Sequence, residues 1–323
     1  MTHDEIALSP ELRLRLAKIA IPRMRGRTLM SIDTPWHTLS IAPSERGTVS
    51  KLLAALDGRR SLAQVARDQR LHLERVVGHA TQLYRAGVAQ LAHAVPVDAR
   101  LFHDHTLASM RLRHVQQTDA IGLIERILAT RSKRLLLGYL VESYHLVHAA
   151  ASHMAGAVLS TSEPGHRMKF SRYLSEEHAH GEWLAGGLKQ AGVSSSRLLQ
   201  SAPLFSTLAV INFLRWTALS DPLVYGLCIG LSEAPSEGSG VRHGIVDFWR
   251  RIDALKLVPS KALVPFRDHQ LEDLDAAHDA LSIIPFEGRA MSTKEQSRIA
   301  GLGLAYADTL AAMERGVLQE YGS

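Results

Sequence analysis

The sequence contains a single cysteine, Cys228, among its 323 residues. An internal disulfide is therefore impossible, and a cysteine-rich zinc site is excluded. The longest apolar stretch, residues 204–231, is interrupted by Arg215, Asp221 and Pro222, so it does not have the form of a membrane-spanning helix. The first residues also lack the apolar core of a secretory signal. We therefore expect a cytoplasmic protein that makes no contact with a membrane.

The composition is that of an ordinary globular protein, with 46% hydrophobic and 21% charged residues, which excludes wholesale disorder. Aromatic residues are few, at 6%, whereas histidine is abundant, with 17 residues. The charge is unevenly distributed. Residues 1–115 carry 17 Lys and Arg against 10 Asp and Glu, a net charge of +7, and the remaining 208 residues carry 20 against 22, a net charge of −2. This asymmetry predicts two units with different partners.

The first 95 residues have the pattern of a small α+β unit. Partial alternation in TLMSID (28–33) and HTLSIA (37–42) predicts two strands of a hairpin, connected through Pro35. Four short helices and a returning strand complete the expected unit; they are residues 10–20, 47–58, 61–69 and 71–87, and the strand 88–92. Ser61 is the expected N-cap of the third of these helices. This order of elements predicts a winged helix.

The segment LLAALDGRRSLAQVARDQRLHLERVVGHATQLYRAGVAQL resembles the PqqD-like winged helices that recognise peptides in natural-product pathways, and the resemblance covers residues 20–92. It implies that a precursor or carrier peptide binds this domain by adding a strand beside the hairpin. A winged helix that binds DNA shares the same pattern, as does a small dimerisation module, so a homodimer is compatible with the sequence. The candidate recognition helix has few side chains suited to reading bases, which disfavours nucleic acid as a partner.

Residues 96–115 lack clean periodicity and are expected to form a linker. From residue 116 to residue 323 strand signals nearly vanish, and seven helical segments remain, at 118–131, 134–158, 164–192, 203–233, 240–255, 260–284 and 292–320. The expected fold is therefore mainly α: a seven-helix bundle at 116–323, preceded by a winged-helix domain at 1–95.

Three of the expected long helices offer a carboxylate close to a histidine. Glu142 lies in an otherwise apolar stretch, where a carboxylate is costly unless it is paired or binds a metal. Glu177 and His180 form an E-x-x-H pair, whose i, i+3 spacing lets a carboxylate and an imidazole bind the same ion. Glu176, His178 and Glu182 are competing assignments within that segment. Each of these features also fits a solvated helix face, but their recurrence in one bundle indicates a metal site.

The sixth helical segment offers two candidate pairs. Asp275 and His278 are three residues apart, whereas His269 and Asp273 form an i, i+4 pair on a nearly opposite helix face. Both pairs cannot face one site on a continuous helix, and apolar neighbours such as Leu274 favour Asp275 and His278. Oxygen ligands combined with a few imidazoles suit Fe(II) or Mn(II) better than a structural zinc.

From residue 117 onward the chain resembles the haem-oxygenase-like diiron oxidase superfamily, the iron-containing redox enzymes related to TenA and PqqC. The resemblance implies a set of metal ligands: Glu142, Glu177, His180, Asp275 and His278. Glu233, in the segment DPLVYGLCIGLSEA, stands at a further glutamate position of the family. One departure is Leu271, which stands where the family often has histidine. The resemblance thus implies one or two Fe(II) ions, and His145, His148, His269 or Glu272 could supply a missing ligand.

The expected function is that of a non-haem iron, O₂-dependent oxidase or oxygenase that modifies an amino-acid or peptide-linked substrate in a natural-product pathway, with O₂ as co-substrate and an external electron donor as a further partner. The reaction type, the catalytic residues and the substrate stay open. The alternatives are a winged-helix DNA-binding regulator with a helical sensor domain, a cofactorless PqqC-like oxidase, and an inactive helical scaffold. Cys228 lacks an adjacent basic group and is expected to be a buried structural thiol, which disfavours thiaminase chemistry.

Overall fold

The computed structural model describes residues 7–18, 20–26, 28–34, 38–118, 122–233 and 241–322. The chain divides into two compact units, which we describe separately. The first comprises Met1–Val115 and Phe286–Gly301, and the second comprises Gln116–Pro285 and Leu302–Ser323. The first unit therefore takes in a late segment of the chain that the sequence assigned to the helical bundle.

The first unit contains two antiparallel three-stranded sheets. One has the order β5-β1-β6, and the other has the order β2-β3-β4. The strands are β1 (Arg13–Leu16), β2 (Ile21–Arg25), β3 (Thr28–Asp33), β4 (Thr38–Ser40), β5 (Asp57–Ser61) and β6 (Ala89–Leu91). The predicted hairpin is present as β3 and β4, and Pro35, in its connection, lies outside the described residues.

The predicted helix at 10–20 is wrong, because Arg13–Leu16 forms a strand. Leu14 is fully buried while Arg13 and Arg15 point outward, which is the two-residue period of a half-buried strand. Charged and apolar residues alternate too briefly here to distinguish the two periods in the sequence. Pairing with β5 and β6 on both sides decides in favour of the strand.

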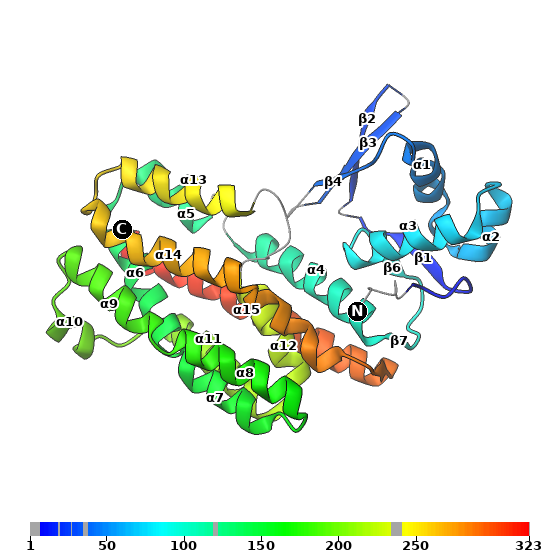
Figure 1. Ribbon diagram of the computed structural model, residues 1–323. Coiled ribbons are helices and arrows are strands. Elements are labelled where there is room, and N and C mark those ends of the chain that lie inside the picture. The colour runs from blue at the N-terminus through cyan, green and yellow to red at the C-terminus, as the bar shows by residue number, and fades with distance from the viewer. Residues whose placement is uncertain are drawn as a thin grey trace. The chain divides into compact units, whose positions relative to one another are not determined.

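The helices of the first unit pack on these strands (Figure 1). They are α1 (Arg46–Ala55), α2 (Leu62–Asp68), α3 (Leu73–Arg85) and α4 (Ala99–Gln117). Ser61 caps α2 as predicted: its hydroxyl accepts the backbone N–H of Gln64, and the Gln64 side chain accepts the N–H of Ser61. The predicted linker at 96–115 is mostly helix α4, because Leu101, Phe102 and other apolar side chains are buried there. Two short strands, β7 (Val97–Asp98) and β8 (Ala290–Met291), pair within this unit.

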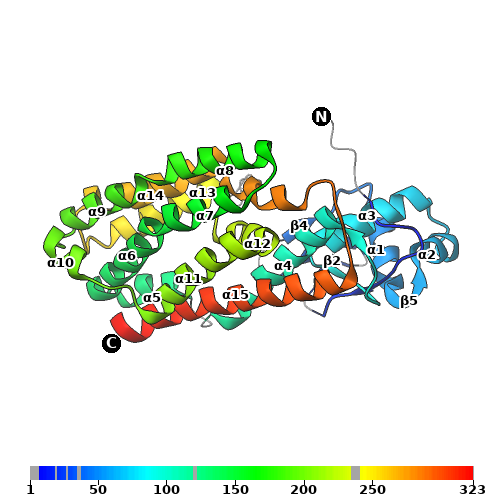
Figure 2. The ribbon, with the colours of Figure 1, turned by 90° about the horizontal axis from the view of Figure 1, so that it is seen from below.

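The second unit is helical throughout its described residues (Figures 1 and 2). Its helices are α5 (Leu123–Thr130), α6 (Lys133–His148), α7 (Ala150–Ser160), α8 (Pro164–Glu177), α9 (His180–Gln190), α10 (Ser195–Gln200), α11 (Phe205–Ser220), α12 (Pro222–Ser232), α13 (Val241–Ala254), α14 (Ser260–Ala276), the 3₁₀ helix η1 (His278–Phe286) and α15 (Thr293–Tyr321), which begins in the first unit.

Three of the predicted long helices are each divided into two. The break between α11 and α12 has a local cause: the Asp221 side chain accepts the N–H of Val224, and Pro222 takes the first helical position, where its missing N–H costs nothing. The other breaks fall at Ala149 and at residues 178–179, where no proline interrupts the sequence. These breaks let short helices change direction, which a single long helix could not do.

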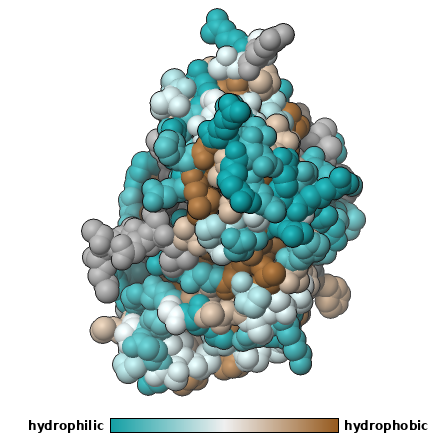
Figure 3. All heavy atoms as spheres, turned by 90° about the vertical axis from the view of Figure 1, so that its right-hand side faces the viewer, coloured by the Kyte–Doolittle hydropathy of each residue, from teal (hydrophilic) through white to brown (hydrophobic). Residues whose placement is uncertain are grey.

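The core of this unit forms where α6, α7, α8, α9, α11, α13 and α14 pack against one another. Close approach of α9 to α6 depends on Gly181, because a Cβ there would lie 2.8 Å from Nδ1 of His148. No helix among the described residues is both long and apolar enough to cross a membrane. The face drawn in Figure 3 is mostly hydrophilic, with small scattered groups of hydrophobic residues.

Candidate metal centre

Glu177 and His180 come together where α8 ends and α9 begins. Glu177 is the last residue of α8 and His180 is the first of α9, so the predicted pair spans a helix junction instead of one continuous helix. The pair still closes: Nδ1 of His180 lies 2.8 Å from Oε2 of Glu177. Both side chains are almost completely buried. They face α14, the helix that packs on α9.

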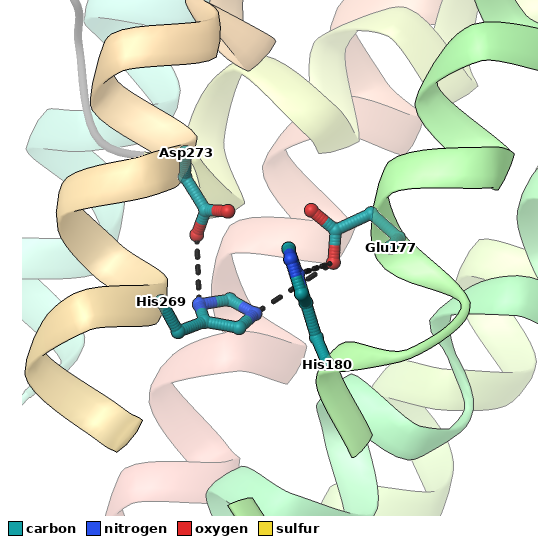
Figure 4. A group of neighbouring side chains, drawn as sticks. All are labelled: Glu177, His180, His269 and Asp273. Atoms are coloured by element: carbon teal, nitrogen blue, oxygen red, sulfur yellow. Dashed lines mark hydrogen bonds and ion pairs between the residues drawn. The ribbon is translucent and has the colours of Figure 1, made fainter. Parts of the chain in front are cut away.

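Helix α14 contributes His269 and Asp273 to the same place (Figure 4). These residues lie one turn apart, and Nδ1 of His269 is 2.9 Å from Oδ2 of Asp273. The other ring nitrogen of His269 lies 3.6 Å from Oε2 of Glu177. Together, Glu177, His180, His269 and Asp273 each offer one ligand atom, and these atoms all lie within 4.8 Å of one another.

A second group adjoins the first and shares Asp273 with it. It consists of Glu233, Asp273 and His278, again with one ligand atom each, all within 4.8 Å of one another. Nδ1 of His278 lies 3.4 Å from Oδ1 of Asp273 and 3.2 Å from Oε1 of Glu177. Glu233 stands at the end of α12, where its carboxylate accepts a 2.6 Å hydrogen bond from the hydroxyl of Tyr173. The two groups therefore form one continuous cluster of carboxylates and imidazoles, which we call the acid–histidine cluster.

Five buried polar atoms of this cluster have no hydrogen-bond partner among the described residues. They are Oε1 of Glu177, Nε2 of His180, Nε2 of His269, Oδ1 of Asp273 and Nδ1 of His278. Nδ1 of His278 lies within ion-pair distance of Oε1 of Glu177 and Oδ1 of Asp273, at 3.2 Å and 3.4 Å, but none of the five atoms makes a hydrogen bond, and buried polar groups usually do. Metal coordination would use the free lone pairs of these atoms. The residues therefore fit a metal ion.

The electrostatics of the cluster point the same way. Burial disfavours the charged form of His269, but Asp273 and Glu177 outweigh burial and raise its pKa to about 10. For His278, burial is likewise outweighed by Asp273 and Glu177, and its pKa is also raised to about 10. Burial would raise the pKa of Glu177, yet the three histidines around it hold that pKa far below its usual range. Strong negative charge concentrated in a buried place attracts protons or, equally, a cation.

Glu233 behaves in the opposite way. Burial and the charges of Asp273 and Glu177 raise its pKa to about 7, although the hydrogen bond from Tyr173 opposes the shift. The negative charge of the carboxylates at this end of the cluster is therefore greater than the positive charge of the histidines. A divalent cation would relieve that repulsion.

The predicted ligand Asp275 lies outside the cluster. Its side chain is about two-thirds exposed and pairs with Arg242 on the surface. Residues two positions apart in an α-helix are separated by about 200° around the helix axis, so Asp273 and Asp275 face opposite sides of α14. The expected i, i+3 relation to His278 fails because α14 ends at Ala276 and Ala277 takes the left-handed conformation, with φ 53°. That turn brings His278 to the face of Asp273, so His278 from one competing pair joins His269 and Asp273 from the other.

Glu142 is buried as expected, but it lies outside both groups of the cluster. Its carboxylate accepts the backbone N–H of Leu204 at 3.1 Å and the hydroxyl of Tyr321 at 3.2 Å. The requirement that a buried carboxylate be paired is thus met by hydrogen bonds from the protein itself. The structure therefore does not bring Glu142 together with the other predicted ligands.

The structure also shows where the alternative ligand candidates lie. His145 faces Ser201, 3.0 Å away, and His148 stacks on Tyr144. Glu272 is largely exposed, and its carboxylate reaches only to 3.7 Å from Nε2 of His180. Of these candidates, only His269 and Glu233 join the cluster. Cys228 is fully buried, and burial raises the pKa of its thiol, as expected for a structural residue.

The principal residue that the sequence analysis set aside is Asp273. A usable signal was present, because His269-x₃-Asp273 matches the histidine–aspartate spacing of the resemblance two residues upstream of the position chosen. In the family's H-x₃-D-x₂-H pattern the second histidine would stand at position 276, whereas His278 comes two residues later. The left-handed Ala277 lies within these two additional residues.

Residues 137–242 match the family model described as "Iron-containing redox enzyme", a haem-oxygenase-like family. This segment includes Glu177, His180 and Glu233, and it ends before α14. No curated protein shows significant similarity to the chain.

Among solved structures, a domain of unknown function with a haem oxygenase-like fold from Shewanella denitrificans is similar to this chain, with 18% identity and a TM-score of 0.53, over 68% of this chain and 91% of that one. A TenA homologue from Pseudomonas syringae pv. tomato matches with 15% identity and a TM-score of 0.49, over 67% and 91% of the two chains. A TenA family transcription regulator from a Silicibacter species matches with 16% identity and a TM-score of 0.48, over 66% and 96%. The protein is therefore mainly helical with a haem-oxygenase-like fold and a small N-terminal β region, and part of its helical unit matches the iron-containing redox enzymes.

Proposed function

We propose that the second unit is a non-haem iron, O₂-dependent oxidoreductase that holds two Fe(II) ions in the acid–histidine cluster. One ion would be bound by Glu177, His180, His269 and Asp273, and the other by Glu233, Asp273 and His278. The observation that carries the proposal is the convergence of five buried, unbonded ligand atoms on one place. The match of residues 137–242 to iron-containing redox enzymes supports iron as the metal.

The donor set suits this choice. Carboxylate oxygens combined with imidazoles, here three of each, favour Fe(II) or Mn(II), and the cluster contains no thiolate. Asp273 belongs to both groups, and the three carboxylates of the cluster would offset the charge of the ions held there. Iron held there would supply the binding and reduction of O₂, which protein side chains alone cannot provide.

The residues around the cluster have definable roles. Tyr173 is fully buried, and its hydroxyl donates to Glu233, which fixes the orientation of that carboxylate. Phe170 and Tyr225 are also buried, and their rings pack together. His269 and His278 hold protons when no metal is present, because their pKa values are raised to about 10. Binding of a cation would release those protons.

The same proposal assigns the substrate to the amino-acid or peptide-linked class and the first unit to peptide recognition. In the β2-β3-β4 sheet, β3 is paired on both sides, so a peptide would add at β2 or β4. We favour β2, because all five of its residues are exposed, including the apolar Ile21 and Met24. An exposed apolar edge strand is a template for pairing with another chain. The positive charge of residues 1–115 would attract an acidic peptide.

The peptide assignment can be tested without knowing the reaction. The probe is a short peptide encoded beside the gene for this chain, labelled for fluorescence polarisation. Replacing both Ile21 and Met24 by Asp should weaken binding by about tenfold or more, since it removes apolar contacts and adds charge. The matched control is Leu73→Asp, an exposed apolar position on α3. Equal binding by the double variant and the control would contradict the assignment of the β2 edge.

The iron assignment is tested by metal content and oxygen uptake. Anaerobic addition of Fe(II) to the purified full-length protein should give two bound ions per chain. Exposure to air should then consume O₂, and Asp273→Asn should abolish both, because Asp273 belongs to both groups. Retention of two ions by that variant would contradict the proposed ligands.

A DNA-binding regulator remains the competing function for the first unit. Several of its arginines are engaged within the unit: Arg60 pairs with Asp57 and Asp68, and Arg75 pairs with Glu45. These ion pairs reduce the charge that phosphates could use. Salt-dependent binding of duplex DNA by the metal-free protein would favour the regulator over the oxidoreductase.

A further inference from the structure

The histidine rings of the acid–histidine cluster differ in whether one ring nitrogen is hydrogen-bonded to a residue outside the cluster. His278 is the one whose outer nitrogen, Nε2, is hydrogen-bonded to a residue outside the cluster: Oε2 of Glu176 lies 3.2 Å away. In His180, Nδ1 is held inside the cluster by Glu177 at 2.8 Å, and Nε2, which lies 3.7 Å from Glu272, makes no hydrogen bond in the described structure. Glu176 therefore has a contact that could act on the metal site without touching the metal.

We infer that Glu176 is a positioning residue, which fixes the ring of His278 so that Nδ1 presents its lone pair to the second ion. The inference rests on the proposed function, because it requires a metal in the cluster. A carboxylate accepts hydrogen bonds, so the nitrogen facing Glu176 must carry the proton. In a neutral imidazole the other nitrogen, Nδ1, is then free of a proton and able to bind a cation.

The contacts of His278 hold its ring in one orientation. Glu176 and Glu177 are the last two residues of α8, and they contact opposite nitrogens of the same ring: Glu176 contacts Nε2, and Glu177 lies 3.2 Å from Nδ1. The ring of Tyr173, one turn earlier on α8, lies 4.4 Å from the His278 ring. His278 is almost completely buried. One helix end therefore sets the position and the tilt of this ligand, and of its two carboxylate contacts only the one at Nε2 is a hydrogen bond, because Nδ1 makes none.

Arg172 extends the contact towards the surface. Its Nε lies 2.7 Å from Oε1 of Glu176, one turn apart on α8, while the other carboxylate oxygen accepts from His278. Each oxygen of Glu176 thus has its own partner, which holds the carboxylate in one orientation. Metal-binding histidines commonly donate their second N–H to such a carboxylate, and loss of that partner typically costs 10–100-fold in metal affinity.

The test uses the full-length protein with Zn(II) as a diamagnetic probe. Two-bond ¹H–¹⁵N correlation on histidine-labelled protein reports which ring nitrogen of His278 carries a proton, and calorimetry reports the affinity for each ion. We expect Nε2–H in the wild type. In Glu176→Ala we expect that signal to be lost and the affinity for the second ion to fall by about tenfold or more, while the first ion binds normally.

Two further variants make the result specific. Glu176→Gln can still accept from Nε2–H through its amide oxygen, so it should keep the signal and most of the affinity. Glu272→Ala removes the carboxylate outside the cluster that lies 3.7 Å from Nε2 of His180, and it should change neither measurement, since no hydrogen bond is lost. Circular dichroism and melting curves establish that each variant is folded.

The outcomes separate this inference from the proposed function. Proton signal on Nδ1 in the wild type, or a Glu176→Ala variant that binds the second ion as tightly as the wild type, would overturn the positioning role while leaving the metal site in place. Failure of the wild type to bind any Zn(II) or Fe(II) would overturn both. Loss confined to the second ion, reversed in Glu176→Gln, would support the inference.

Discussion

Two buried carboxylates of the helical unit, Glu142 and Glu177, differ in how their oxygens are satisfied. Both oxygens of Glu142 accept hydrogen bonds, from a backbone N–H and from the Tyr321 hydroxyl. Glu177 is surrounded by imidazoles, and its Oε1 has no hydrogen bond among the described residues. Both belong to helices with apolar neighbours, and both looked like ligands in the sequence. Burial of a carboxylate therefore does not by itself indicate a metal ligand, whereas a buried carboxylate oxygen without a hydrogen bond, set among imidazoles that share the same place, makes Glu177 a candidate ligand.

The largest effect is expected from the carboxylate that lacks protein partners. Glu177→Gln should reduce bound iron to a small fraction of the wild-type content, because Glu177 contacts the rings of His180, His269 and His278. Glu142→Gln should keep the full iron content. Elemental analysis of proteins loaded with Fe(II) under identical conditions measures both. Equal iron loss in the two variants would remove the distinction drawn between them.

The second effect concerns the stability of the metal-free protein at high pH. His269 and His278 have folded-state pKa values raised from 6.5 to about 10, so the stability that they contribute is fully present below pH 6.5 and is lost as the pH rises towards 10. The free energy of unfolding of the metal-free protein should fall between pH 7 and pH 10 by an amount on the order of 3 kcal/mol.

Denaturant titrations at several pH values measure this change. The decline should persist in Glu142→Gln, which leaves the cluster intact, and should be shallower in His269→Asn, which removes one titrating ring. A slope that is identical in wild type and His269→Asn would contradict the assigned pKa shift. Saturating Zn(II) should also flatten the decline, because the cation takes the place of the protons.

A smaller effect is expected at the satisfied carboxylate. Glu142→Ala removes the acceptor for Leu204 and Tyr321 and leaves a space among buried side chains. The free energy of unfolding should fall by about 1–3 kcal/mol for the unpaired donors. Thermal or urea unfolding measures the loss. Unchanged stability together with lost iron would show that Glu142 acts as a ligand after all.

The smallest effect is expected at Asp275. Its side chain forms an exposed ion pair with Arg242, and such pairs contribute about 0–1 kcal/mol. Asp275→Asn should therefore keep its iron and nearly all of its stability, in contrast to Asp273→Asn two residues away. Iron content of the two variants, measured side by side, decides which aspartate of α14 serves the cluster.

The sequence predicted the main features of both units, with differences at places where pairing in three dimensions prevails. The hairpin of β3 and β4 and the Ser61 cap of α2 are local features, and they were predicted correctly. Strand β1 was predicted as a helix because its identity depends on neighbours that lie more than 40 residues away in the chain. The PqqD-like identity of the first unit and its peptide partner stay predictions, as does a cytoplasmic location.

For the candidate site, the residue types were determined by the sequence alone. The spacing of His269 and Asp273 follows from the helical repeat and needs no tertiary information, whereas Glu177 and His180 meet across the junction of α8 and α9. Choosing between Asp273 and Asp275 required knowing where α14 ends. A left-handed residue at Ala277 redirects the chain, and no proline or glycine marks that turn in the sequence.

The tertiary structure alone decided which buried acids were already satisfied. Glu142 meets Leu204 and Tyr321, which are 62 and 179 residues away in sequence, so no local pattern could show that it was paired. The sequence supplied helices that carry acids and histidines on their faces, since amphipathic periodicity is a local property. Packing of α8, α9, α12 and α14 determined which of those side chains share a dry, unsatisfied place, because hydrogen-bond partners there come from distant parts of the chain.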